Sequence, residues 1–188
     1  MDNAVNIAKN MNTLAHLESL LIPILDGFTE EQQNLTDPNH RIVFTATKNN
    51  TVELFAADGT LDDNESFGER INKVVRQINE EVKTNELYKE DRKYLVYYKD
   101  YTSSFNYKIY IHDILTGSKD DLKFIRQLSA YFVEPQTREF YQISMSAGSY
   151  SVNKGYKLLR DIENYEEDEI VKGLEKDLTL IMDNIVYR

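Results

Sequence analysis

Histidine is the residue type that most often serves acid/base catalysis and metal binding near neutral pH. The chain has three, His16, His40 and His112, and none sits in a recognisable metal-binding or catalytic motif. His112 is followed directly by Asp113, but adjacent residues of a strand point to opposite faces, so the pair cannot form a dyad. We therefore expect no enzyme active site, no metal and no cofactor.

A small-residue segment from Met145 to Ser151 is the second place where chemistry could occur, since it includes Gly148 and is followed by Lys154. Backbone amides at the start of a helix can hold an anion. The spacing matches neither a phosphate-binding loop nor a dinucleotide fingerprint, and no serine lies in a nucleophile elbow. A turn from a strand into a helix needs small residues in any case, so we interpret this segment as structural.

Carboxylates gather in two short segments that contain no Lys or Arg. Residues 58–69 hold five acidic residues, and residues 161–169 hold six. A calcium loop would explain the first, but the glycine needed at its sixth position is absent whether counting starts at Asp58 or Asp62. Two explanations remain open: acidic residues that favour the start of a helix, or a negative surface that steers a basic partner.

Tyrosine is the most abundant aromatic residue, with 13 Tyr against 8 Phe, and most of the tyrosines lie in the second half of the chain. Tyrosine offers a large contact area and a hydroxyl group, and it is enriched at interfaces, although half-exposed tyrosines are also ordinary on sheets. Taken with the acidic segments, this distribution predicts a partner-binding surface. Its candidate residues are Asp62, Asp63, Glu65, Tyr98, Tyr101, Tyr110, Glu166, Glu167 and Asp168.

In the first half of the chain, hydrophobic spacing predicts two helices on either side of a hairpin. Apolar residues at three- and four-residue intervals indicate an amphipathic helix over 4–25. Alternation over 42–47 and 52–56, with Asn49 and Asn50 between them, predicts a β-hairpin. Ser66 followed by Glu69 forms a capping box, so the next helix should run from about Ser66 to Asn85.

The second half repeats this order of hairpin and helix. Residues 94–98 and 107–114 predict a second hairpin, with Leu95, Ile109 and Ile111 facing inward and Tyr110 and His112 pointing the other way. The spacing of apolar residues over 122–132 predicts a helix that ends at Pro135, and residues 139–146 predict another strand. The stripe from Ile170 to Ile185 predicts a terminal helix.

These elements predict an α+β fold in a single domain covering residues 1–188. The sheet should be mainly antiparallel, with about five strands made of two hairpins plus one strand, because hairpins supply most of its connections. Helices should cover one face of the sheet, and amphipathic helices should lie at both termini.

Composition narrows the function further. The formal net charge of -10 argues against nucleic-acid and anionic-membrane binding, which need clustered Lys and Arg. The absence of cysteine rules out disulfides, thiolate metal sites and a cysteine nucleophile. No signal sequence or membrane span is recognisable, so we expect a cytoplasmic protein.

The leading hypothesis is therefore a small protein-binding module that covers a basic partner, such as an immunity protein or antitoxin that neutralises a basic toxin. Two alternatives remain. One is a small-ligand-binding protein, or an enzyme of unrecognised type, that uses the sheet face near His112. The other is a phage or mobile-element protein that mimics DNA, or a scaffolding protein.

Overall fold

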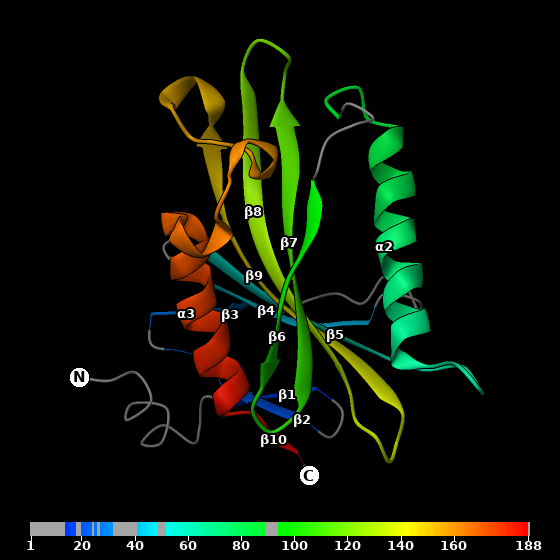
Figure 1. Ribbon diagram of the computed structural model, residues 1–188. Helices are drawn as coiled ribbons and strands as arrows, with labels where there is room; N and C mark the ends of the chain where they lie inside the picture. Colours follow the sequence, from blue (N-terminus) through cyan, green and yellow to red (C-terminus); the bar gives the residue numbers. More distant parts are fainter. Residues whose placement is uncertain are drawn as a thin grey trace.

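The computed structural model describes residues 14–17, 20–23, 25, 27–31, 41–48, 52–88 and 94–187, which form two antiparallel sheets and two α-helices (Figure 1). The larger sheet has seven strands in the order β3-β4-β5-β9-β8-β7-β6. Its strands are β3 (Thr29–Glu31), β4 (Arg41–Lys48), β5 (Val52–Thr60), β6 (Leu95–Thr102), β7 (Asn106–Gly117), β8 (Leu122–Val133) and β9 (Glu139–Ser151).

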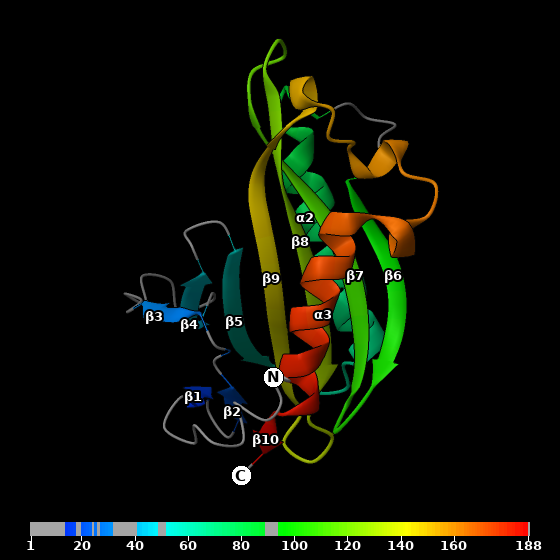
Figure 2. The same cartoon turned by 90° about the vertical axis from the view of Figure 1, so that its left-hand side faces the viewer.

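The smaller sheet has three strands, with β2 (Leu20–Pro23) between β1 (Leu14–Leu17) and β10 (Val186–Tyr187). It lies near the C-terminal end of α3 (Figure 2). The helices are α2 (Phe67–Lys83) and α3 (Glu169–Asp183), and three short 3-10 turns, η2 (Val152–Lys154), η3 (Leu159–Asp161) and η4 (Tyr165–Glu167), connect β9 to α3.

The α+β class is confirmed, and the sheet is antiparallel as predicted. The two hairpins are β4–β5 and β6–β7, and the additional strand is β9. The sheet is larger than expected because β3 and β8 join these five strands. Asn49 and Asn50 lie outside the described residues.

The predicted helix over 122–132 is wrong, because these residues form strand β8 between β7 and β9. Phe124, Leu128 and Phe132 are spaced by four residues, and that interval fits both one face of a helix and one face of a strand. The intervening positions on the same face are Arg126 and Ala130, which are also fully buried. A buried arginine in this row concealed the alternation that identifies a strand.

The predicted N-terminal helix is also wrong where the structure describes it. Strand β1 pairs antiparallel with β2, and residues 4–13, 18, 19 and 24 of the prediction lie outside the described residues. All four residues of β2 are buried. A short apolar run buried on both faces is not distinguished from a helix by periodicity. At the other end, α3 is followed by β10, so a strand rather than a helix closes the described chain.

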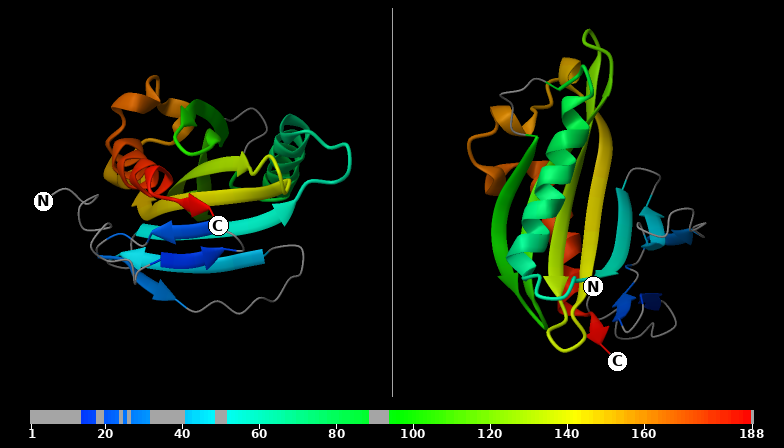
Figure 3. Two further views of the ribbon diagram at one scale, coloured as in Figure 1. Left: turned by 90° about the horizontal axis from the view of Figure 1, so that it is seen from below. Right: turned by 90° about the vertical axis from the view of Figure 1, so that its right-hand side faces the viewer.

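The two helices lie on opposite faces of the large sheet, whereas the sequence predicted that the helices would share one face (Figure 3). Helix α3 packs with one face of β7, β8 and β9 and with β2 in the main core. Helix α2 packs through Ile71 on the other face, where Tyr131 and Phe140 are its main buried neighbours. Residues next to each other in one strand therefore face different helices.

Candidate functional site

The loop before α2 carries the first acidic segment, and its residues differ sharply in exposure. Asp62 and Asp63 are exposed, whereas the side chain of Glu65 is only 4% exposed. Arg70 Nε donates to Glu65 Oε1 at 2.9 Å, and Lys73 also pairs with this carboxylate. The hydrogen bond from Arg70 is the main reason that the pKa of Glu65 falls to about 2.

This loop is also fastened to the β8–β9 turn. Arg138 Nη2 donates to the backbone carbonyl groups of Asp62, at 2.6 Å, and Glu65, at 2.8 Å. Ser66 then caps α2 and forms the predicted capping box with Glu69. Glu65 therefore acts as an internal anchor for the start of α2, whereas Asp62, Asp63 and Glu69 of this segment are exposed.

Asp168, in the second acidic segment, is bound to a buried arginine. Arg126 makes a two-pronged ion pair with Asp113, at 2.8 and 2.9 Å, and its Nη1 donates to Asp168 Oδ2 at 3.0 Å. Asp168 also accepts a hydrogen bond from the backbone N–H of Val171 and so caps α3. The side chains of Arg126 and Asp113 are both 0% exposed. This network fixes the start of α3 to the centre of the sheet.

The rest of the second segment faces outward. Glu166 and Glu167 lie in η4 and are exposed, as are Asp161, Glu163 and Glu169. Asp161 pairs with Arg160 at 3.3 Å. Among the described residues, Glu163, Glu166 and Glu167 make no ion pair.

Two of the predicted tyrosines, Tyr98 and Tyr101, are hydrogen-bonded to carboxylates of α3 that lie outside both acidic segments. Tyr98 donates its hydroxyl to Glu175 Oε2 at 2.7 Å, and Tyr101 donates to Asp183 Oδ1 at 2.6 Å. The bond to Asp183 is the main cause that raises the pKa of Tyr101 to about 12. These phenols therefore link the edge strand β6 to α3.

Tyr110 lies on the opposite face of the sheet. Its ring contacts Tyr97 on the neighbouring strand β6, with ring centroids 5.6 Å apart, and Tyr131 on the neighbouring strand β8, with ring centroids 6.0 Å apart. Ile109 and Ile111 face the main core as predicted, but Leu95 pairs with His112 and belongs to the Tyr110 face. The nine predicted site residues are thus divided among the loop before α2, the segment before α3, the β6–α3 contact and the α2 face.

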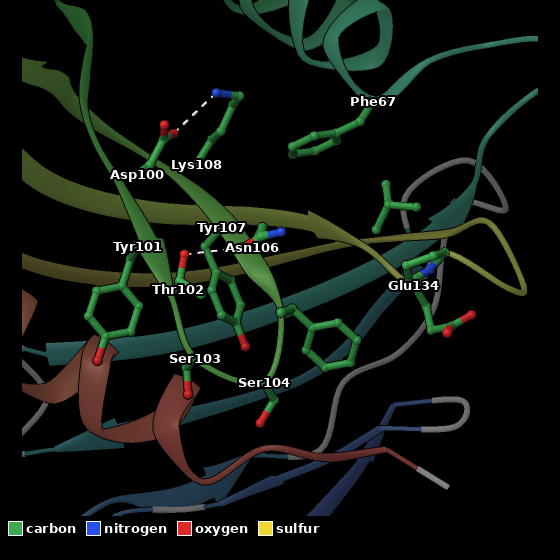
Figure 4. A pocket seen from close by; sticks show the side chains of 13 residues that line it. Phe67, Asp100, Tyr101, Thr102, Ser103, Ser104, Asn106, Tyr107, Lys108 and Glu134 are labelled. Atoms are coloured by element: carbon green, nitrogen blue, oxygen red, sulfur yellow. Dashed lines mark hydrogen bonds and ion pairs between the residues drawn. The ribbon is translucent and has the colours of Figure 1, made fainter.

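A cavity of about 690 Å³ lies where the β6–β7 and β8–β9 turns meet the start of α2 (Figure 4). Tyr101 is the predicted residue that lines it. Phe67 and Val133 supply apolar walls, and Thr102 Oγ1 bonds to Asn106 Oδ1 at 3.1 Å. Lys108 is already paired with Asp100 at 3.1 Å, so the cavity offers mainly hydroxyl and amide groups for binding. The other lining residues are Ser103, Ser104, Phe105, Tyr107, Glu134 and Pro135.

His112 is the one histidine whose side chain the structure describes. Its Nε2 atom is buried without a hydrogen-bond partner, and burial lowers the pKa of His112 to about 4. Asp113, its neighbour in sequence, faces the other way and pairs with Arg126, as expected for a strand. Within the described part of the chain, no three His, Asp or Glu side chains gather closely enough to hold a metal ion.

Sequence reasoning missed the basic and acidic partners that organise these sites. Arg70 and Lys73 lie five and eight residues after Glu65, which precedes the N-cap of α2, so helical spacing does not predict their pairing. The pairing of Arg126 with Asp113 depends on the register of β7 and β8, and nothing in the sequence indicated it while 122–132 was interpreted as a helix.

None of the helices in the described ranges has the length and apolar character needed to cross a membrane.

No family model and no curated protein matches this chain. Among solved structures, the chain is similar to LpqN, a protein involved in cell envelope biogenesis of Mycobacterium tuberculosis. The alignment covers 89% of this chain and 82% of LpqN, with 12% sequence identity and a TM-score of 0.45.

Proposed function

We propose that this protein is a cytoplasmic, single-domain binding module for a basic protein partner, as an immunity protein or antitoxin would be for a basic toxin. The observation that carries the proposal is the exposed group Glu163, Glu166 and Glu167, for which the described residues provide no ion pair. Unpaired surface carboxylates create a negative potential that attracts a cationic surface and raises its association rate.

Four of the nine residues that the sequence suggested are bound within the protein. Glu65 and Asp168 are engaged in internal ion pairs, and Tyr98 and Tyr101 are hydrogen-bonded to α3. We assign the partner contact to the segment 161–169, which we call the acidic turn segment. Because η4 and the cap of α3 hold this segment in a defined shape, binding would not require it to become ordered.

Charge reversal tests this proposal. A variant with Glu163→Lys, Glu166→Lys and Glu167→Lys should lose the basic protein that the wild type captures from cells of the native host. The matched control is Asp63→Lys, Glu80→Lys and Glu81→Lys, which makes the same charge change at exposed positions around α2.

The captured protein is then measured for its association rate against salt concentration. We expect association to be slower by about tenfold or more at low salt for the variant in the acidic turn segment, and to change much less for the control. Equal rates for the two variants, or capture of proteins with no excess of basic residues, would reject the assignment.

A second candidate, small-ligand binding on the α2 face of the sheet, is favoured by the unpaired Nε2 of His112. A buried polar atom without a partner costs about 1–3 kcal/mol, and a ligand that displaced the side chains covering this atom and bonded to it would recover part of that cost. The test is a thermal-shift screen of small polar compounds against wild type and His112→Phe. A compound that stabilises only the wild type supports this candidate, and a screen with no such compound rejects it.

A further inference from the structure

A second cavity, of about 600 Å³, lies at the opposite end of the sheet from the cavity in Figure 4. It is formed by the β7–β8 turn, the end of β9 and the η2 turn, at the top of the molecule in Figure 1. It contains the small-residue segment that the sequence pointed to, although β9 leads there into a 3-10 turn and not into an α-helix. Its lining residues are Asp121, Lys123, Gly148, Ser149, Tyr150, Ser151, Lys154 and Tyr156.

The charge of this cavity is opposite to that of the protein. Two lysines and one carboxylate line it, in a chain whose formal net charge is -10. Lys123 Nζ lies 3.4 Å from Asp121 Oδ2, whereas Lys154 makes no ion pair with any described residue. A concave surface concentrates the potential of its charged groups, so this cavity favours an anion.

Two tyrosine rings line the same cavity as the two lysines. The rings of Tyr150 and Tyr156 are 4.8 Å apart, and Tyr156 is 44% exposed, which is unusual for a large apolar ring in this protein. Burial raises the pKa of Tyr150, so its phenol stays protonated and can donate a hydrogen bond. Ser149 and Ser151 add further hydroxyl groups. A planar ring can stack on Tyr156 while an attached anion reaches the lysines.

The walls of the cavity are held in place before any ligand arrives. Asn153 Nδ2 donates to the backbone carbonyl of Asp120 at 2.9 Å, which joins η2 to the β7–β8 turn. A Cβ atom on Gly148 would lie 2.9 Å from Ile125 Cγ1, so only glycine permits this close approach of β9 to β8. Binding to a preformed site costs less conformational entropy than binding to a site that must first be ordered.

We propose that this cavity binds a small molecule in which an anionic group is joined to a planar ring, with Lys123 and Lys154 holding the anion and Tyr156 stacking on the ring. A phosphate monoester and a carboxylate can each supply this anionic group, and one probe of each kind is tested. This proposal is independent of the partner-binding function, because the cavity and the acidic turn segment have no residue in common.

The test titrates four probes into the full chain and follows backbone amide NMR signals. The probes are adenosine 5′-monophosphate, which has a ring and a phosphate; orotate, which has a ring and a carboxylate; adenosine, which has no charge; and inorganic phosphate. We expect one of the two anionic ring compounds to bind with a Kd of about 1 mM or tighter. The shifts should be concentrated in residues 121–123 and 148–156, and adenosine and phosphate alone should bind more weakly.

Variants decide whether the named side chains are responsible. Lys154→Gln and Tyr156→Leu should each weaken the better probe by about fivefold or more, which corresponds to about 1 kcal/mol. Lys157→Gln is the matched control, since it removes an equal charge three residues away at an exposed position that does not line the cavity.

Three results would overturn the proposal: adenosine binding as tightly as the anionic compounds, no binding of either anionic ring compound at about 1 mM, or equal weakening by Lys154→Gln and Lys157→Gln.

Discussion

The two helices begin in similar ways but depend on the sheet to very different degrees. Both start at a capping side chain, Ser66 in α2 and Asp168 in α3. Helix α3 then buries five residues in the main core, whereas α2 buries only Ile71. Ion pairs and caps hold the starts of both helices, but α3 adds much more hydrophobic burial than α2 does. Similar capping therefore starts both a helix that belongs to the main core and a helix with little buried surface.

The largest change in stability is expected at Arg126, whose ion pairs join the start of α3 to the sheet. Arg126→Ala should lower the free energy of unfolding by about 3–5 kcal/mol, because Asp113 would remain buried without its partner. Denaturant unfolding measures this change. The double variant Arg126→Met and Asp113→Leu should recover much of the loss, since it removes both buried charges. A single variant that loses less than about 1 kcal/mol would show that water or another group replaces the pair.

Truncation of one aliphatic side chain in each helix compares their packing directly. Leu178→Ala in α3 should cost about 2–5 kcal/mol, because this side chain is fully buried in the main core. Ile78→Ala in α2 should cost less than about 1 kcal/mol, because Ile78 is only partly buried. Equal losses in denaturant unfolding would mean that α2 is as tightly packed as α3.

The contribution of Glu65, the anchor of α2, to the free energy of unfolding should depend on pH. Glu65 has a pKa of about 2 in the folded protein against its ordinary value of 4.5, so its contribution to stability is complete above pH 4.5 and is lost as pH falls towards 2. Glu65→Gln should cost about 1–2 kcal/mol at pH 7 and progressively less over this window. Unfolding curves at several pH values measure the difference, with the exposed Asp63→Asn as control. A loss that does not change with pH would contradict the ionic anchor.

The smallest effect is expected at the contact between β6 and α3. Tyr101 has a pKa of about 12 in the folded protein, above its usual 10, so its hydrogen bond to Asp183 stabilises the fold below pH 10 and is lost as pH rises towards 12. Tyr101→Phe should cost about 0.5–1.5 kcal/mol at pH 7. Tyr156→Phe, for which no hydrogen bond of the hydroxyl is seen among the described residues, should cost less. If Tyr156→Phe lowers the thermal stability as much as Tyr101→Phe or more, the bond between Tyr101 and Asp183 does not contribute to stability.

Local patterns in the sequence predicted the elements that depend on neighbours in the chain. The capping box of Ser66 and Glu69, the helix that follows and the β6–β7 hairpin were predicted correctly because each is encoded within a few residues. Strand β8 was missed because its face includes Arg126, whose partner Asp113 lies on the adjacent strand. The acidic segments were visible, but the roles of Glu65 and Asp168 depended on cations that only folding brings near.

The placement of β9 between β5 and β8 has a consequence for the time at which the sheet can be completed. Val52 of β5 pairs with Ala147 of β9, so the β4–β5 hairpin leaves the ribosome long before its neighbouring strand is synthesised. Until then, one edge of that hairpin has unpaired backbone groups and is open to pairing with other chains. Slow translation through the residues that precede β9 would prolong this exposure and should favour aggregation of the nascent protein.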